Sequence, residues 1–137
     1  MISAKTQFLL IAGPFLMFIM VKASNGNWND VFAVADWSMA AVVIFCQSFT
    51  TLVPAIVNSA KRGTNINSDA LLWHLIVMII CGLIPSFYIY SEIIALPQGS
   101  SPDWKYQLAQ MVMFSLASFK FFWDHRVVKK LAKLTSS

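Results

Sequence analysis

The run "ALLWHLIVMIICGLIPSFYIYSEIIAL", residues 70–96, decides the fold of this chain because it carries one formally charged side chain, Glu92, in 27 residues. A helix rises about 1.5 Å per residue, and about 20 apolar residues cross the hydrocarbon core of a bilayer. The run is therefore long enough to form a membrane-spanning helix. It predicts an integral membrane protein rather than a soluble domain.

The rest of the chain supports this class. It has 137 residues, the length of one domain, and it is 58% hydrophobic and only 12% charged, well outside the range of soluble globular proteins. We expect an all-α fold, a four-helix transmembrane protein forming a single integral membrane domain over residues 1–137. The expected spans are residues 7–22, 36–58, 70–96 and 105–123, followed by a basic amphipathic C-terminal extension over 124–137.

The first of these spans has the weakest signal. Residues 7–22 are short for a span and contain Gly13 and Pro14. A secretory signal peptide is the alternative interpretation, because Lys5 precedes the apolar run and small residues follow it around residues 21–23. We retain it as a span, which gives four crossings.

The distribution of positive charge predicts the orientation. Lys and Arg in short loops are retained on the cytoplasmic side of a membrane. With both termini inside, only Lys22 and Lys105 of the ten Lys and Arg residues lie outside. The cytoplasmic set is Lys5, Lys61, Arg62, Lys120, Arg126, Lys129, Lys130 and Lys133. Tryptophan prefers the headgroup level, and the residues near the expected span ends are Trp28, Trp37, Trp73, Trp104 and Trp123.

Polar side chains recur along the second span at helical spacing. The stripe consists of Gln47, Thr51, Pro54 and Asn58, and we expect it to face protein rather than lipid. It could line a pore or supply hydrogen bonds between helices, and we prefer the second reading. Cys46 and Cys81 have no Cys-x-x-Cys partner, so we interpret them as small buried residues.

The third span places its two ionisable residues at opposite ends. His74 and Glu92 are 18 residues apart, about 27 Å along a helix, so they cannot pair with each other. We expect Glu92 to lie at the outer interface and His74 to be hydrogen-bonded. The alternative is that Glu92 binds a cation or pairs with Lys22 or Lys105, and that His74 changes charge near neutral pH on the cytoplasmic side. Pro85 is expected to kink this helix.

The segment "RVVKKLAKL", residues 126–134, predicts an amphipathic basic tail. Lys120 and Asp124, just before it, are spaced for an ion pair across one helical turn. A helix lying on the anionic inner leaflet is the default interpretation, protein docking is the second, and direct binding of nucleic acid is not expected. The predicted docking or lipid-binding residues are Lys61, Arg62, Arg126, Lys129, Lys130 and Lys133.

The chain lacks recognisable catalytic patterns. It contains no His-Glu-x-x-His motif, no metal-ligand spacing, no clustered carboxylates in the spans, and no acid and base expected within reach of one another. We therefore predict no catalytic residue, no metal site and no cofactor. An enzyme and a proton-coupled carrier are both disfavoured.

The stretch "DWSMAAVVIFCQSFTTLV", residues 36–53, is followed by a Lys-Arg-Gly turn and a long third span. This arrangement, covering about a third of the chain, resembles the membrane subunit of the Kiwa anti-phage defence system. The resemblance implies a homo-oligomer, with a tetramer expected, in the bacterial inner membrane. It also implies a response to envelope disturbance at phage infection and a cytosolic DNA-binding effector as partner. No functional residue is transferred from the family.

The surface available to such a partner is small. The segment at residues 58–69 and the basic tail are the sizeable cytoplasmic features, so an effector would dock there. Small residues on the fourth span would permit a neighbouring subunit to approach closely. They are Ala109, Ser115, Ala117 and Ser118. Two other functions stay open: a pore former, such as a holin or abortive-infection effector, with the Gln47 stripe lining water, and an immunity protein against a pore-forming bacteriocin.

Overall fold

The structure is a computed structural model that describes residues 4–26, 31, 36–63, 68–97 and 100–134. Within these ranges all extended regular structure is helical, which confirms the all-α class. The helices are α1 (Ala4–Ser24), α3 (Asp36–Lys61), α4 (Ser68–Met78), the π-helical turn η1 (Ile79–Leu83), α5 (Ile84–Ile94) and α6 (Trp104–Leu134). The interfacial role predicted for Trp28 falls outside the described residues.

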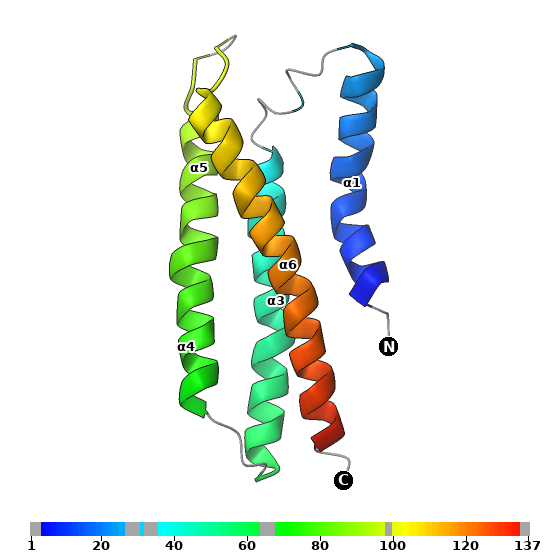
Figure 1. The fold of residues 1–137 in the computed structure, drawn as a ribbon, viewed down its shortest axis with the longest axis vertical. Coiled ribbons are helices and arrows are strands. Elements are labelled where there is room, and N and C mark those ends of the chain that lie inside the picture. The colour runs from blue at the N-terminus through cyan, green and yellow to red at the C-terminus, as the bar shows by residue number, and fades with distance from the viewer. Residues whose placement is uncertain (1–3, 27–30, 32–35, 64–67, 98–99, 135–137) are drawn as a thin grey trace.

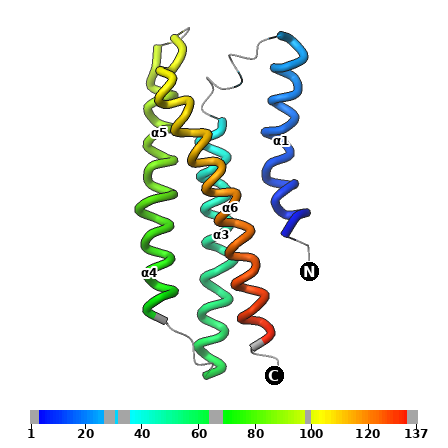
Figure 2. Tube along the Cα trace, viewed as in Figure 1, coloured from blue at the N-terminus to red at the C-terminus, as the bar shows by residue number. Residues whose placement is uncertain are grey.

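The helices form a bundle in which the chain alternates in direction. Figure 1 shows α3 and α6 side by side, with α4 and α5 on one flank and α1 on the other. The trace in Figure 2 passes down α3 and α6 and up α1 and α4–α5. The starts of α1 and α4 and the ends of α3 and α6 therefore lie at one end of the bundle, here called the C-terminal end. Lys5 and Lys129 line a common pocket there.

Three helical segments are long and apolar enough to cross a membrane: α1, α3 and the continuous rod Asp69–Ile94. This confirms the first three expected spans as helices of membrane type, including the one interrupted by Gly13 and Pro14. The fourth expected span does not meet the same measure among the described residues. Polar residues such as Gln107, Gln110 and Lys120 lie within its apolar run. Its helix also continues past residue 123 to Leu134 without a break.

The turn before Pro85, where the sequence predicted a kink, is π-helical. Pro85 has no N–H, and its ring conflicts with the carbonyl four residues earlier in a regular helix. The turn immediately before it widens: the N–H of Ile84 donates to the carbonyl of Ile79, five residues back. The Ser86 hydroxyl donates to the carbonyl of Gly82 at 2.8 Å. The rod thus passes the proline without ending.

The core lies between α3, the α4–α5 rod and α6. Small residues allow close approach of the backbones, since Ala41 on α3 and Ala117 on α6 are both 0% exposed. The remaining buried apolar members of this cluster are Ile44, Phe45, Met78, Ile89, Ile93, Met113 and Phe121. Ala117 is thus buried inside the subunit, although the sequence suggested that it would contact a neighbouring subunit. Ser115 and Ser118 donate to carbonyls of their own helix.

Candidate functional site

The most unusual side chain in the bundle is Asp124 of α6, which is 0% exposed. Its Oδ1 lies 3.0 Å from His74 Nε2 of α4, and its Oδ2 lies 2.5 Å from Ser48 Oγ of α3. Lys120, one turn earlier on α6, contacts Oδ2 as an ion-pair partner. One carboxylate therefore connects three helices. We call Ser48, His74, Lys120 and Asp124 the buried ionic cluster.

The sequence places these groups together through helix periodicity. On α6, Gln110, Met113, Ala117, Phe121 and Asp124 are buried at spacings of three and four residues, so they form one face. On α3 the facing residues include Ile44, Ser48 and Leu52, each at most 1% exposed. Ser48 is small enough to let the carboxylate reach α3. A second polar contact, Ser38 Oγ to Gln110 Oε1 at 3.3 Å, joins the same two faces farther along.

Hydrogen-bond roles in the cluster follow from the carboxylate. An ionised carboxylate only accepts, so the Ser48 hydroxyl, the Lys120 ammonium and His74 Nε2 all donate to it. A buried charge is tolerated only when it is paired and hydrogen-bonded. Asp124 has one cationic partner and two further donors on its two oxygens. The cluster is thus internally satisfied within a largely apolar bundle.

The cluster contains an acid, a base and a hydroxyl, but not in the order of a hydrolase. A serine nucleophile must contact the base that removes its proton. Here Ser48 and His74 each contact the carboxylate, on different oxygens. The geometry therefore does not activate the Ser48 hydroxyl. Across the described part of the chain, no group of three or more His, Cys, Asp or Glu side chains is arranged to hold a metal ion.

His74 and Lys120 also line a cavity of about 270 Å³ between α3, the α4–η1 segment and α6. The other lining residues are Phe45, Val77, Met78, Cys81, Gly82, Leu116 and Phe119. Gly82 is required for the packing here, because a Cβ at this position would lie 2.7 Å from the ring of Phe45. The π-helical turn carries Gly82, so the widened segment of the rod borders the ionic cluster.

Part of the buried ionic cluster was predicted from the sequence. The Lys120–Asp124 pair was predicted and is confirmed. The expectation that no acid and base lie within reach was wrong, since His74 contacts Asp124. Ser48 was missed altogether, although it lies at the spacing of the buried face of α3. Glu92, at the far end of the rod, lies near the phenol of Tyr88 and takes no part in the cluster.

The polar stripe predicted on α3 lies beside the buried face rather than on it. Gln47 and Thr51 are half-buried, whereas Pro54 and Asn58 are exposed on the isolated chain. The Thr51 hydroxyl donates to the backbone carbonyl of Gln47 at 2.8 Å, so it is satisfied within its own helix. The expectation that the whole stripe packs against protein is therefore wrong for the subunit alone.

The cysteines differ from expectation in the same way. Cys46 and Cys81 are both free and exposed on the bundle surface. Each is adjacent in sequence to a core residue, Phe45 and Gly82 respectively. A step of one residue along the helix therefore moves a side chain from the buried face to the outer face. The interpretation of both as buried residues was wrong.

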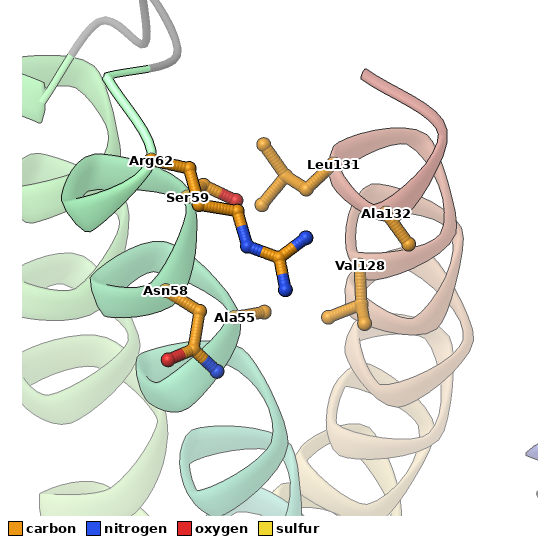
Figure 3. A pocket seen from close by; sticks show the side chains of 7 residues that line it. All are labelled: Ala55, Asn58, Ser59, Arg62, Val128, Leu131 and Ala132. Atoms are coloured by element: carbon orange, nitrogen blue, oxygen red, sulfur yellow. The ribbon is translucent and has the colours of Figure 1, made fainter. Parts of the chain in front are cut away.

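The basic tail continues α6 and packs against the end of α3. Leu131 is 8% exposed, and Figure 3 shows the guanidinium of Arg62, in the turn after α3, pointing toward Val128 and Ala132. These residues, with Ala55, Asn58 and Ser59, line a cavity of about 320 Å³. The tail is therefore part of α6, and its position on the inner leaflet stays a prediction. The exposed predicted docking residues are Lys61, Arg62, Arg126, Lys129, Lys130 and Lys133.

Comparison of the chain with protein-family models, with curated proteins and with solved structures found no match.

Proposed function

We propose that this chain is a non-enzymatic sensor and anchor of the bacterial inner membrane, in which all four long helices cross the bilayer and the C-terminal end of the bundle faces the cytoplasm. A soluble effector receives its signal there. The proposal rests on three features: the outer surface of α6, the buried ionic cluster, and the basic C-terminal end.

The outer surface of α6 supports a fourth crossing. Leu108, Val112, Leu116 and Phe119 are between 48% and 69% exposed, at spacings of three and four residues. The polar residues Gln110 and Asp124 are turned inward and are 0% exposed. Apolar outside and polar inside is the arrangement expected of a helix in lipid. Exposed Trp104 and Trp123 are 19 residues apart, about 29 Å, which matches the hydrocarbon thickness.

The buried ionic cluster is the observation that carries the sensor function. A movement of α4 against α6 would separate His74 from Asp124 and leave polar groups unpaired in a medium of low dielectric constant. Intermediate positions are therefore unfavourable, and the helices have discrete arrangements rather than a continuous range. Because α6 is one uninterrupted helix from Trp104 to Leu134, a tilt at the cluster also moves the basic end.

The setting and the partner come from the resemblance to the membrane subunit of the Kiwa system. The setting is a response to envelope disturbance at phage infection, and the partner is a cytosolic DNA-binding effector. Exposed positive charge at the C-terminal end suits docking of an acidic face of that effector. Assembly into a homo-oligomer, with a tetramer expected, would cover the half-buried Gln47 and the exposed Asn58. Native mass spectrometry in detergent should show the tetramer; monomers alone would contradict this part.

Docking is tested by affinity purification of the tagged chain with its effector. The double variant Lys130→Gln and Lys133→Gln should reduce recovery of the effector by at least tenfold. The matched control, Lys22→Gln and Lys105→Gln, removes the same charge from the other end of the bundle and should leave recovery unchanged. Glutamine avoids adding negative charge that would disturb insertion. Equal recovery with both double variants would contradict docking at the basic end.

A pore former is the second candidate, because Gln47 is only half-buried and Asn58 is exposed, so the stripe could line water in an oligomer. The two functions differ in a membrane-potential measurement. A sensor should leave the potential of expressing cells unchanged without a trigger. Depolarisation on expression alone, abolished by Gln47→Leu, would favour the pore.

A further inference from the structure

A second basic pocket lies where the start of α1 meets α6, apart from the ionic cluster. It has a volume of about 320 Å³ and is lined by Ala4, Lys5, Phe122, His125, Arg126 and Lys129. Three of these six residues carry a full positive charge, and no carboxylate is among those described as lining it. Asp124, the nearest acid in sequence, is engaged by Ser48, His74 and Lys120. Among the described residues that line it, the formal charges are therefore all positive.

His125 supplies an independent sign of a ligand. The side chain is 9% exposed, and its Nδ1 is buried with no hydrogen-bond partner. Its ring lies against Phe121 at a centroid distance of 4.6 Å, so packing holds it in place. A buried polar atom without a partner is energetically unfavourable. His125 lines the pocket, so an anionic oxygen that reached Nδ1 would accept a hydrogen bond from it and remove this cost.

The N-terminus of α1 contributes to the same site. Ala4 and Lys5 are the first two residues of this 21-residue helix. The first N–H groups of a helix lack acceptors within the helix, and the helix dipole makes this end attractive to anions. With the cationic side chains and His125, the pocket presents donors from two helices. A tetrahedral phosphate group accepts hydrogen bonds from several directions and suits such a set.

The depth of the pocket points to a lipid rather than a free ion. Trp73 and Trp123 are 65% and 49% exposed, and exposed tryptophans mark the headgroup level of a bilayer. Phe122 and His125, neighbours of Trp123 on α6, line the pocket, so it lies at that level once the helices are in the membrane. Phe122 also offers an apolar wall beside the charged residues.

We propose that this pocket binds the phosphodiester of an anionic phospholipid of the inner leaflet. Lys5, Arg126 and Lys129 neutralise the phosphate, His125 Nδ1 donates to one of its oxygens, and the acyl chains lie along Phe122 and the outer surface of α1. The site fixes α1 to α6 through a lipid. This goes beyond the proposed function, because it needs only that α1 and α6 reach the membrane interface and does not depend on any effector.

The test is lipid binding by the full chain in detergent, followed by native mass spectrometry with phosphatidylglycerol and phosphatidylcholine. Phosphatidylglycerol should bind at least tenfold more tightly. The double variant Lys5→Gln and Arg126→Gln should lose this preference. The control double variant Lys61→Gln and Lys130→Gln removes two exposed charges at the same end but outside the pocket, and should keep it. An equal loss in both would overturn the pocket in favour of diffuse surface charge.

Two further measurements complete the test. His125→Phe keeps a ring against Phe121 but removes the nitrogen, so it should weaken phosphatidylglycerol binding at least threefold without lowering the thermal stability measured in the absence of phosphatidylglycerol. Unchanged affinity in this variant would overturn the contact to Nδ1. Inorganic phosphate at millimolar concentration should not displace the lipid; displacement would show that the pocket binds free phosphate instead.

Discussion

Helices α1 and α6 differ in a way that explains how this bundle is built. Helix α1 is apolar enough to cross a membrane, yet among its residues with described burial only Ala12 is buried. Helix α6 fails the same measure of hydropathy, yet it buries Phe121, Gln110 and Asp124 completely. Helix α1 meets the measure of a membrane helix and makes little protein contact, whereas α6 fails it and supplies a full face of the core.

The difference has a physical cause. In a bilayer there is no hydrophobic force between helices, because lipid chains are as apolar as leucine side chains. An apolar helix such as α1 therefore gains little by packing, whereas polar groups on α6 must find partners inside the protein. Hydropathy summed over a helix measures its fitness for lipid and misses which face is buried. The following variants test this contrast, from the largest expected effect to the smallest.

Removal of the central charge should have the largest effect. Asp124→Asn keeps the size of the side chain but leaves the Lys120 ammonium without its counter-charge in a buried site. Breaking a buried ion pair in this way costs about 3–5 kcal/mol. Unfolding of the purified chain, followed by tryptophan fluorescence, should show this loss. The control Asp103→Asn, at an exposed acid before α6, should change stability little; equal effects in the two variants would contradict the role given to the cluster.

A methyl group added at Gly82 should have the next largest effect. The new Cβ would lie 2.7 Å from the buried Phe45 ring, and overpacking of this kind costs about 1–3 kcal/mol. Gly13→Ala on α1 is the matched control, because a Cβ there meets nothing within 4 Å and alanine favours the helix. Thermal unfolding should show a loss at residue 82 and none at residue 13. A loss at both positions would mean that α1 is as tightly packed as the rod.

The attachment of α1 should give the smallest effect. Phe8 contacts Phe121 and Phe122 at centroid distances of 5.9 and 5.0 Å, and aromatic pairs contribute about 0.5–1.5 kcal/mol. Phe8→Ala should therefore lower stability by about 1 kcal/mol in the same unfolding assay. Leu9→Ala, at a neighbouring residue that is 66% exposed, should change it by less. If Leu9 proves the more important residue, the direction that α1 presents to the bundle is wrong.

The sequence predicted the helices better than their contacts. Long apolar runs are sufficient to predict α1, α3 and the rod, and the spacing of Lys120 and Asp124 is sufficient to predict a pair on one helix. The contacts of Asp124 with Ser48 and His74 join residues 76 and 50 positions away, and these depend on the rotation of three helices. No local pattern fixes that rotation, which is also why Cys46 and Cys81 were placed on the wrong side.

The sequence of α6 contains no helix-breaking residue between its apolar part and its basic part. Residues 104–134 contain neither glycine nor proline, so nothing in the sequence stops the helix at residue 123. The basic part was predicted as an amphipathic helix at the membrane surface. It is continuous with the rest of α6, and Leu131 packs at the end of α3.

The account depends most on the claim that α6 crosses the membrane with its polar face turned inward. Labelling of intact cells with a membrane-impermeant maleimide tests this directly, in a chain carrying Cys46→Ser and Cys81→Ser. Ser101→Cys, just before α6, should be labelled from outside, whereas Lys130→Cys should be labelled only after the cells are permeabilised. Labelling of both positions from outside, or protection of both, would contradict the crossing of α6.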